Sequence, residues 1–256
     1  MFGMKNFFYE LEKLRGVVLR PFVLFFTVVL GLLVLSFREV TLYGLPIPLL
    51  VVGTPTLATN LFLSAKSFLV PENVPLVALG PVSAFVAPLT MSLLVSLLIT
   101  FPYTLYSIEK YLRPALYQKE RATIYKFLLP SLFLFYLGCA FGYFLIIPKT
   151  FSILYSFAAP IGVTPLFDLD SFVSSVFLVT VSVGATFLLP VAMVLLTRLS
   201  LIPHEQWLQH WRGALLAALV FSAVITPDGS GVTMVFLFVP LILLYGIGAV
   251  FSRKSF

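Results

Sequence analysis

The chain has 256 residues, of which 60% are hydrophobic and only 10% are charged, and its formal net charge is +6 at pH 7. Soluble domains carry roughly 25% charged residues, so this composition excludes an ordinary water-facing globular protein. Apolar runs such as "FVLFFTVVLGLLVLSF" are hydrophobic on every face, whereas the strands of a membrane β-barrel alternate in polarity. The composition therefore predicts an all-α integral membrane protein.

The residues up to Arg20 form a charged amphipathic stretch, in which Glu10 and Glu12 interrupt the basic region that a cleavable signal peptide requires. Beyond it, apolar segments long enough to cross a bilayer alternate with more polar connections. They predict one polytopic membrane domain over residues 1–256. Its six spans are expected at residues 21–37, 82–102, 127–147, 171–196, 213–227 and 232–251.

Residues 40–65 are uncharged and long enough for a seventh span. However, Pro46, Pro48 and Pro55 make a regular helix in lipid unfavourable. We therefore expect this segment to be an apolar extracytoplasmic cap between the first and second spans, lying against the membrane.

The distribution of positive charge supports six spans. With six, every Lys and Arg except Arg38, Lys66 and Lys149 lies on one side of the membrane, together with both termini. A seventh span would move the four basic residues of the N-terminal stretch to the opposite side and remove this bias. Because positive residues collect on the cytoplasmic side, both termini are predicted to be cytoplasmic.

Few residues offer catalytic or metal-binding chemistry. In "HEQWLQH", His204 and His210 are six residues apart, whereas a zinc-binding helix needs histidines four apart; position 208 is leucine. We interpret this stretch as an interfacial helix with Trp207 and Trp211 at the headgroups. The predicted spans carry ionisable residues only at their ends, which disfavours an enzyme or an ion-coupled transporter. No metal, cofactor or nucleic acid is expected.

Polarity is concentrated instead after the second span, in "FPYTLYSIEKYLRPALYQKER". A proline leaves the span, a tyrosine follows four residues later, and P-A-L-Y-x-x-E-[KR] comes next. Further along are "LFYLGCAFGYFLIIP", "FLLPVAMVLL", "ITPDGSG" and "VPLILLYGIGAVFSR", and near the start stands "YELEKL". In order and spacing these motifs resemble the TatC family, the multispanning receptor subunit of the twin-arginine protein translocase. The matching residues of the main motif are Pro102, Tyr106, Pro114, Ala115, Leu116, Tyr117, Glu120 and Arg121.

The resemblance implies how the polar motif acts. The family recognises folded proteins for export by two arginines in their signal peptides, and a guanidinium pairs well with a carboxylate. The implied signal-peptide site comprises Glu10, Glu120, Arg121, Tyr117 and Pro114. The resemblance further implies single-span TatA/TatB-type partners, a homo-oligomer within the translocase, the proton gradient as energy source, and a prokaryotic plasma membrane. The surrounding basic residues are expected to meet anionic lipid headgroups.

The sequence also departs from the family. A glutamate usual in the fourth span is Leu188 here, and one usual in the sixth span is Gly246. Together with Pro190 and Asp228, we assign these positions to partner contact or structure, and we expect Thr186 or Ser182 to compensate for the missing carboxyl. The fifth span is about 22 Å long against a hydrocarbon core of about 30 Å, a mismatch that should thin the bilayer locally or be shielded by neighbouring helices.

Two alternatives to a signal-peptide receptor remain open. A membrane scaffold paralogue without signal-peptide binding fits the loss of both intramembrane glutamates. A small-solute transporter fits the hydrophobicity, although the two halves of the chain share no repeated motif.

Overall fold

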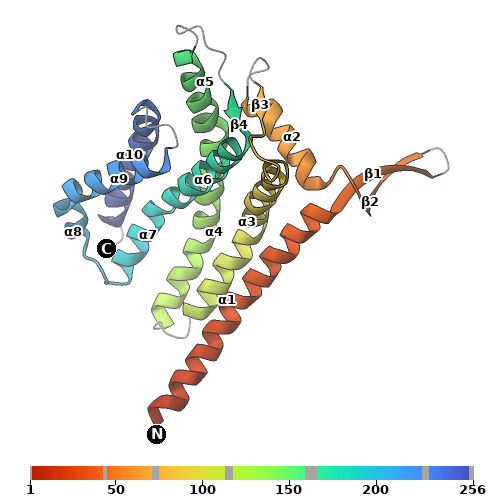
Figure 1. Cartoon of the computed structure of the whole chain (residues 1–256). Coiled ribbons are helices and arrows are strands. Elements are labelled where there is room, and N and C mark those ends of the chain that lie inside the picture. The colour runs from red at the N-terminus through yellow and green to blue at the C-terminus, as the bar shows by residue number, and fades with distance from the viewer. Residues whose placement is uncertain are drawn as a thin grey trace. The chain divides into compact units, whose positions relative to one another are not determined.

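The computed structural model of the chain describes residues 2–42, 45–70, 75–112, 118–158, 166–226 and 231–253. Its contacts divide the chain into two compact units. The first comprises Met1–Ser107 and Thr164–Ser174, and the second comprises Ile108–Val163 and Ser175–Phe256. Each unit is built mainly from helices (Figure 1).

The first unit begins with a long helix, α1 (Phe2–Val34), which continues through Pro21. A hairpin follows it directly, formed by the antiparallel strands β1 (Leu35–Leu42) and β2 (Leu45–Val52). The chain then forms the helices α2 (Leu57–Leu69) and α3 (Ser83–Leu112). Most apolar side chains of α1 that the structure describes are exposed, as lipid-facing residues would be.

The hairpin is a feature that the sequence did not predict. Residues 40–65 were expected to form an apolar cap, and most of them instead lie in β1, β2 and the start of α2. Pro46 and Pro48 are compatible with β2 because both strands of a hairpin are edge strands, where a missing N–H group is tolerated. The prediction of a mainly helical protein is thus confirmed with short β-structure added to it, and the cap's position against the membrane stays a prediction.

Polar contacts tie the start of α3 to the start of α6 (Leu169–Phe187) within the first unit. The short strands β3 (Leu76–Val77) and β4 (Phe167–Asp168) pair in parallel, and the Ser83 hydroxyl donates to Asp170 at 2.7 Å. Asp168 accepts bonds from the backbone N–H and the hydroxyl of Ser171. Because these donors stabilise the ionised carboxylate, the pKa of Asp168 lies below its ordinary value.

The second unit contains two interrupted helical segments. In the first, α4 (Gln118–Phe141) and α5 (Ile147–Ala158) are joined by one π-helical turn, Gly142–Ile146. This wider turn precedes Pro148, whose ring would clash with the carbonyl four residues earlier in a regular helix. In the second segment, α6 is followed by α7 (Leu189–Arg198). The break falls at Leu188, just before Pro190, which lacks the N–H group needed to continue α6.

Three further helices complete the second unit. They are α8 (His204–Gln209), α9 (Trp211–Ile225) and α10 (Val232–Arg253), and α10 packs closely on α7 and α9. Glycines permit close helix approach at two crossings. A Cβ on Gly184 of α6 would lie 2.4 Å from the Cys139 sulfur of α4, and one on Gly248 of α10 would lie 3.0 Å from the Pro190 Cα. Small residues at such crossings are typical of membrane helices.

Among the described residues, five helices are long and apolar enough to cross a membrane: Arg15–Val34, Ser83–Tyr111, Lys126–Leu154, Leu169–Arg198 and Met234–Arg253. They correspond in order to five of the six predicted spans. The predicted fifth span corresponds to the shorter apolar helix α9, which has 15 residues. The count of six spans and the orientation of the termini therefore stay predictions.

Cysteine labelling tests the topology. In a Cys139→Ala background, cysteines introduced as Phe2→Cys and Ser255→Cys should react only from the cytoplasmic side. Glu72→Cys should react only from the opposite side, because it lies between the first and second predicted spans. Labelling of the two termini from opposite sides would restore a seventh span.

Candidate functional site

Four of the five predicted signal-peptide residues, all except Glu10, lie in or directly after the connection between α3 and α4. Helix α3 ends at Leu112, and α4 begins at Gln118. Glu120 and Arg121 are thus in the first turn of α4, and Glu10 is in α1. The side chains of these three residues, and Pro114 and Tyr117 entirely, lie outside the described residues. The proximity of Glu10 and Glu120 therefore stays a prediction.

A buried carboxyl near this connection was not singled out by the sequence. The second span was expected to end at Pro102, but α3 runs through this proline and carries Glu109 in its last turns. Glu109 is 4% exposed, although the neighbouring Lys110 is exposed. Burial of a carboxyl is costly unless polar groups surround it. The last turns of α3 therefore bury a carboxyl group within the motif, between Tyr106 and Pro114.

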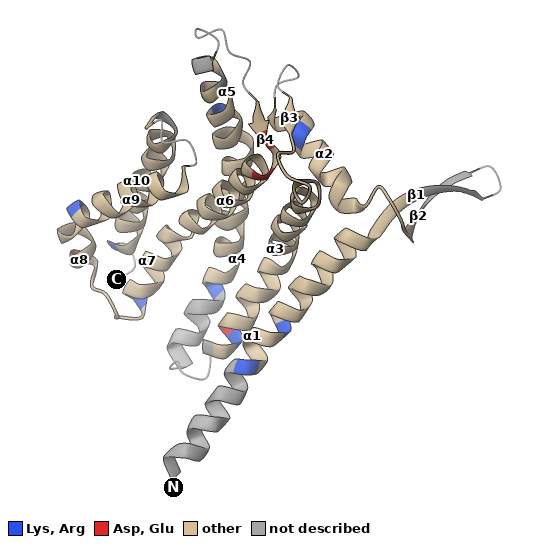
Figure 2. Cartoon of the chain, in the orientation of Figure 1, with Lys and Arg blue, Asp and Glu red and all other residues tan. Residues whose placement is uncertain are grey.

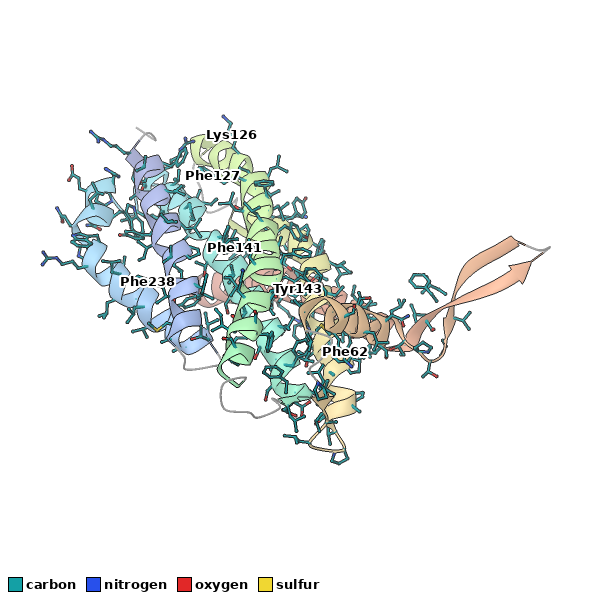
Figure 3. All side chains as sticks on the ribbon, turned by 90° about the horizontal axis from the view of Figure 1, so that it is seen from above. Phe62, Lys126, Phe127, Phe141, Tyr143 and Phe238 are labelled. Atoms are coloured by element: carbon teal, nitrogen blue, oxygen red, sulfur yellow. The ribbon has the colours of Figure 1, made fainter. Side chains whose placement is uncertain are left out.

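The opposite side of the connection continues into α4 through Lys126 and Phe127. Figure 3 shows both residues at one end of this helix, with Phe141 further along it. The Arg198 guanidinium at the end of α7 lies 5.3 Å from the centre of the Phe127 ring. A cation over an aromatic face is a favourable contact, so this pair links α4 to the end of α7.

Two of the predicted partner-contact positions are at the break between α6 and α7. Leu188 is half-buried and precedes the first residue of α7, and Pro190 is buried against α10. Gly246 is exposed, and a Cβ there would meet nothing within 4 Å. Asp228 lies outside the described residues. The structure thus gives Pro190 a packing role in the contact of α7 with α10 and leaves Gly246 at an open surface.

An apolar groove lies beside the break, between α6–α7, α9 and α10. We call it the α9 groove; its volume is about 400 Å³. Its lining residues are Ala185, Thr186, Leu189, Ala214, Ala217, Ala218, Phe221, Leu241, Ile242 and Tyr245. The sequence signal for it was the run of small residues in "GALLAALV", since small side chains on one helix leave room for another helix to approach.

Two hydroxyl groups line the α9 groove, and each already donates a hydrogen bond to a backbone carbonyl. Thr186 donates to the Ser182 carbonyl at 2.8 Å, and Tyr245 donates to the Trp207 carbonyl at 2.6 Å. Each oxygen retains the capacity to accept a bond. Thr186, one of the two residues expected to replace the missing glutamate, therefore presents an acceptor in the groove next to Leu188.

The fold and its five membrane-length apolar helices define a polytopic helical membrane protein. A model of the family described as Sec-independent protein translocase protein (TatC) matches residues 10–240. The chain belongs to this TatC family, whose members are components of a protein translocase rather than enzymes.

Individual relatives agree with this assignment. TatC of Cenarchaeum symbiosum is 33% identical over 251 residues, covering 96% of this chain and 93% of the relative. TatC of Escherichia coli K12 is 33% identical over 183 residues, with 72% and 70% covered. A crystal structure of the twin-arginine translocase receptor TatC superposes with a TM-score of 0.77 at 26% identity, covering 96% of this chain and 99% of that one.

Proposed function

We propose that this chain is the receptor and core scaffold of a twin-arginine translocase and binds twin-arginine signal peptides at the cytoplasmic face of the membrane. The observation that supports this most strongly is the family match through the P-A-L-Y-x-x-E-[KR] motif, with its glutamate in the first turn of α4. A carboxylate at a membrane surface is only partly screened by water and salt, which favours pairing with a guanidinium. Glu120 is the proposed primary contact, and Glu10 the second.

Charge at the helix ends supports the proposed orientation with six spans and cytoplasmic termini. In this topology, the cytoplasmic ends of α3, α7, α9 and α10 carry Lys110, Arg198, Arg212 and Arg253, respectively, and Lys126 stands where the apolar span of α4 begins. Figure 2 shows Lys and Arg, in blue, mainly toward the ends of the apolar helices rather than along their middles. Positive residues at these positions favour retention of the ends on the cytoplasmic side of a plasma membrane.

For the partners, we propose that a single-span subunit of the TatA/TatB type packs into the α9 groove. The groove is apolar, as a helix from the bilayer requires, and its small side chains allow close approach. Its hydroxyl oxygens suit a partner helix that carries one hydrogen-bond donor. Partner docking at this face would leave the cytoplasmic motif free for the signal peptide.

Leu188→Glu tests this docking site. A carboxyl beside the groove adds a polar group that a partner helix can contact, so crosslinking to the single-span partner should become stronger while the protein remains folded. Its contrasting variant is Ala217→Leu, which fills the groove and should weaken the same crosslink. Unfolding of Leu188→Glu in detergent would show that position 188 is tightly packed and would contradict this assignment.

A second candidate function is a membrane scaffold without signal-peptide binding. Leu188 and Gly246 favour it, because both positions lack the glutamate usual in the family. Crosslinking of the purified protein to a twin-arginine signal peptide separates the two. A crosslink that disappears when the two arginines are replaced by lysines supports the receptor, and its complete absence supports the scaffold.

A further inference from the structure

Three side-chain hydrogen bonds hold the short helix α8 against α7 and α10. Trp207 donates from its ring nitrogen to the Thr197 hydroxyl of α7 at 3.0 Å. Tyr245 of α10 donates to the Trp207 carbonyl at 2.6 Å, and His204 contacts the Ser252 hydroxyl of α10 at 2.9 Å. We call these three bonds the α8 clamp. They join α8 to two different helices, so α8 is held in one position.

The directions of the hydrogen bonds show that the donors and acceptors of the clamp are matched. The Ser252 hydroxyl donates a hydrogen bond to the Ala249 carbonyl, so its oxygen accepts a hydrogen bond from the Nδ1–H group of His204. Thr197 likewise donates to the Met193 carbonyl and accepts from Trp207. Ser252 and Thr197 are 0% and 2% exposed, respectively. Buried acceptors of this kind are costly to leave without a donor, which stabilises α8 in place.

The clamp sets the depth of α8 relative to α10. Ser252 and Tyr245 are seven residues apart, which is about 10 Å along a helix. A tyrosine on a helix leans toward the N-terminus, so its hydroxyl is no nearer the C-terminal end than its Cα. Helix α8 therefore lies beside the last two turns of α10 rather than beyond its end, as Figure 1 also shows.

Helices α8 and α10 expose side chains of opposite polarity at the same depth. On α10, Ile247, Val250 and Phe251 are exposed apolar residues, at 47%, 60% and 57%. Such residues belong in the hydrocarbon of the bilayer. On α8, the exposed residues include Glu205, Gln206 and Gln209, and His210, which directly follows the helix, is also exposed. These polar side chains need water or headgroups, because burial of unpaired polar groups in hydrocarbon is costly.

The rim of α8 has the composition of a surface for anionic headgroups. Leu201, Leu208 and Trp211 are exposed apolar side chains next to this helix. The exposed arginines Arg198, Arg212 and Arg253 lie at the adjoining ends of α7, α9 and α10, against one exposed carboxylate, Glu205. The Arg212 guanidinium lies 5.6 Å from the centre of the Trp211 ring. Aromatic and basic residues combined in this way are typical of the membrane interface.

We propose that the α8 clamp indents the cytoplasmic leaflet locally. Anionic phospholipid headgroups reach inward to the level of Tyr245 over α8, and Arg212 and Arg198 bind their phosphates. On the neighbouring face of α10 the hydrocarbon continues to Ile247, Val250 and Phe251. This indentation of the leaflet follows from the hydrogen bonds of α8, because they also fix the depth at which the next helix, α9, begins. It does not depend on signal-peptide binding.

The first experiment compares two sites at one depth. Single cysteines from Gln206→Cys and Ile247→Cys, each in a Cys139→Ala background, are spin-labelled in vesicles of phosphatidylcholine and phosphatidylglycerol. The α8 label should collide mainly with a water-soluble nickel chelate, and the α10 label mainly with oxygen dissolved in the lipid. A flat leaflet would give both labels the same accessibility, and that result would overturn the proposal.

The clamp itself is tested by a double variant, Tyr245→Phe with Ser252→Ala, in the same vesicles. Trp207 and Trp211 are the chain's two tryptophans, and Trp211→Phe leaves Trp207 as a single depth probe. Loss of each bond should raise the fraction of molecules in which α8 is detached from α7 and α10 roughly fivefold. Trp207 then lies further from the centre of the bilayer, so bromines deep in the acyl chains should quench its fluorescence less. Tyr103→Phe, which alters an exposed tyrosine of α3, is the matched control. Unchanged quenching in the double variant would contradict the role of the clamp.

Headgroup selectivity gives an independent test. With Trp207→Phe leaving Trp211 as the probe, brominated phosphatidylglycerol should quench it more strongly than brominated phosphatidylcholine at equal mole fraction. Arg212→Gln should reduce this preference roughly fivefold. Arg20→Gln, which removes an exposed arginine of α1, should leave it unchanged. Equal quenching by the two lipids, or an equal loss in the Arg20 variant, would show that α8 has no anionic-headgroup site.

Discussion

Glu120→Ala is expected to abolish detectable binding of a twin-arginine signal peptide while membrane insertion is unaffected. A charge-assisted hydrogen bond contributes roughly 1.5–3 kcal/mol, so the affinity should fall by about tenfold or more. Glu120→Gln should fail similarly, because it keeps the shape of the side chain and loses the charge. Peptide affinity is measured by fluorescence anisotropy on protein in nanodiscs.

The matched control for this experiment is Glu205→Gln. Glu205 is an exposed carboxylate of α8 on the same proposed side of the membrane, so it tests whether any cytoplasmic carboxylate would have the same effect. Its loss should leave affinity unchanged, and Glu10→Ala should weaken binding. Unaltered affinity in both the Glu120→Ala and Glu10→Ala proteins would refute the proposed site without affecting the headgroup site at α8.

Gly184→Ala is expected to lower the thermal unfolding midpoint by roughly 2–10 °C. The added Cβ would lie 2.4 Å from the Cys139 sulfur and 3.1 Å from the Phe135 ring, which are too close for unstrained contact. Cys139 and Phe135 are 4% and 2% exposed, so neither has free space into which it can move. The midpoint is measured in detergent by the temperature dependence of tryptophan fluorescence.

Cys139→Ala should recover most of the lost stability of Gly184→Ala, since it removes the sulfur and leaves only the longer contacts with the Phe135 ring, the closest at 3.1 Å. Gly246→Ala is the matched control. Its Cβ would meet nothing within 4 Å, and alanine is the better helix former, so stability should be unchanged or higher. A Gly184→Ala protein as stable as the unmodified chain would show that α4 and α6 do not cross closely at this point.

Local sequence patterns predicted most of the helical architecture. Apolar runs of about 20 residues need no partner to favour a helix in lipid, because the helix satisfies its own backbone groups. The family was likewise evident from the linear motif around Glu120, whose residues are close in the sequence. Even the break in the fourth span has a local cause, since Pro190 lacks an N–H group.

The remaining features depend on which segments pair or pack together, which polarity patterns do not specify. The hairpin β1–β2 was missed because prolines argue against a helix without indicating which backbone segments pair. The extension of α3 past Pro102 was missed because a proline within a membrane helix is tolerated where neighbouring groups compensate.

The sequence by itself thus determined the membrane class, the order of the apolar segments and the position of the polar motif, because these depend on composition and local spacing. Only the tertiary structure placed Thr186 and Tyr245 in the α9 groove, Gly184 against Cys139, and α8 beside the last turns of α10. These contacts join residues far apart in the chain, such as His204 and Ser252, which are 48 positions apart. Polarity patterns cannot specify such pairs, because they arise from how helices of similar hydrophobicity pack on one another.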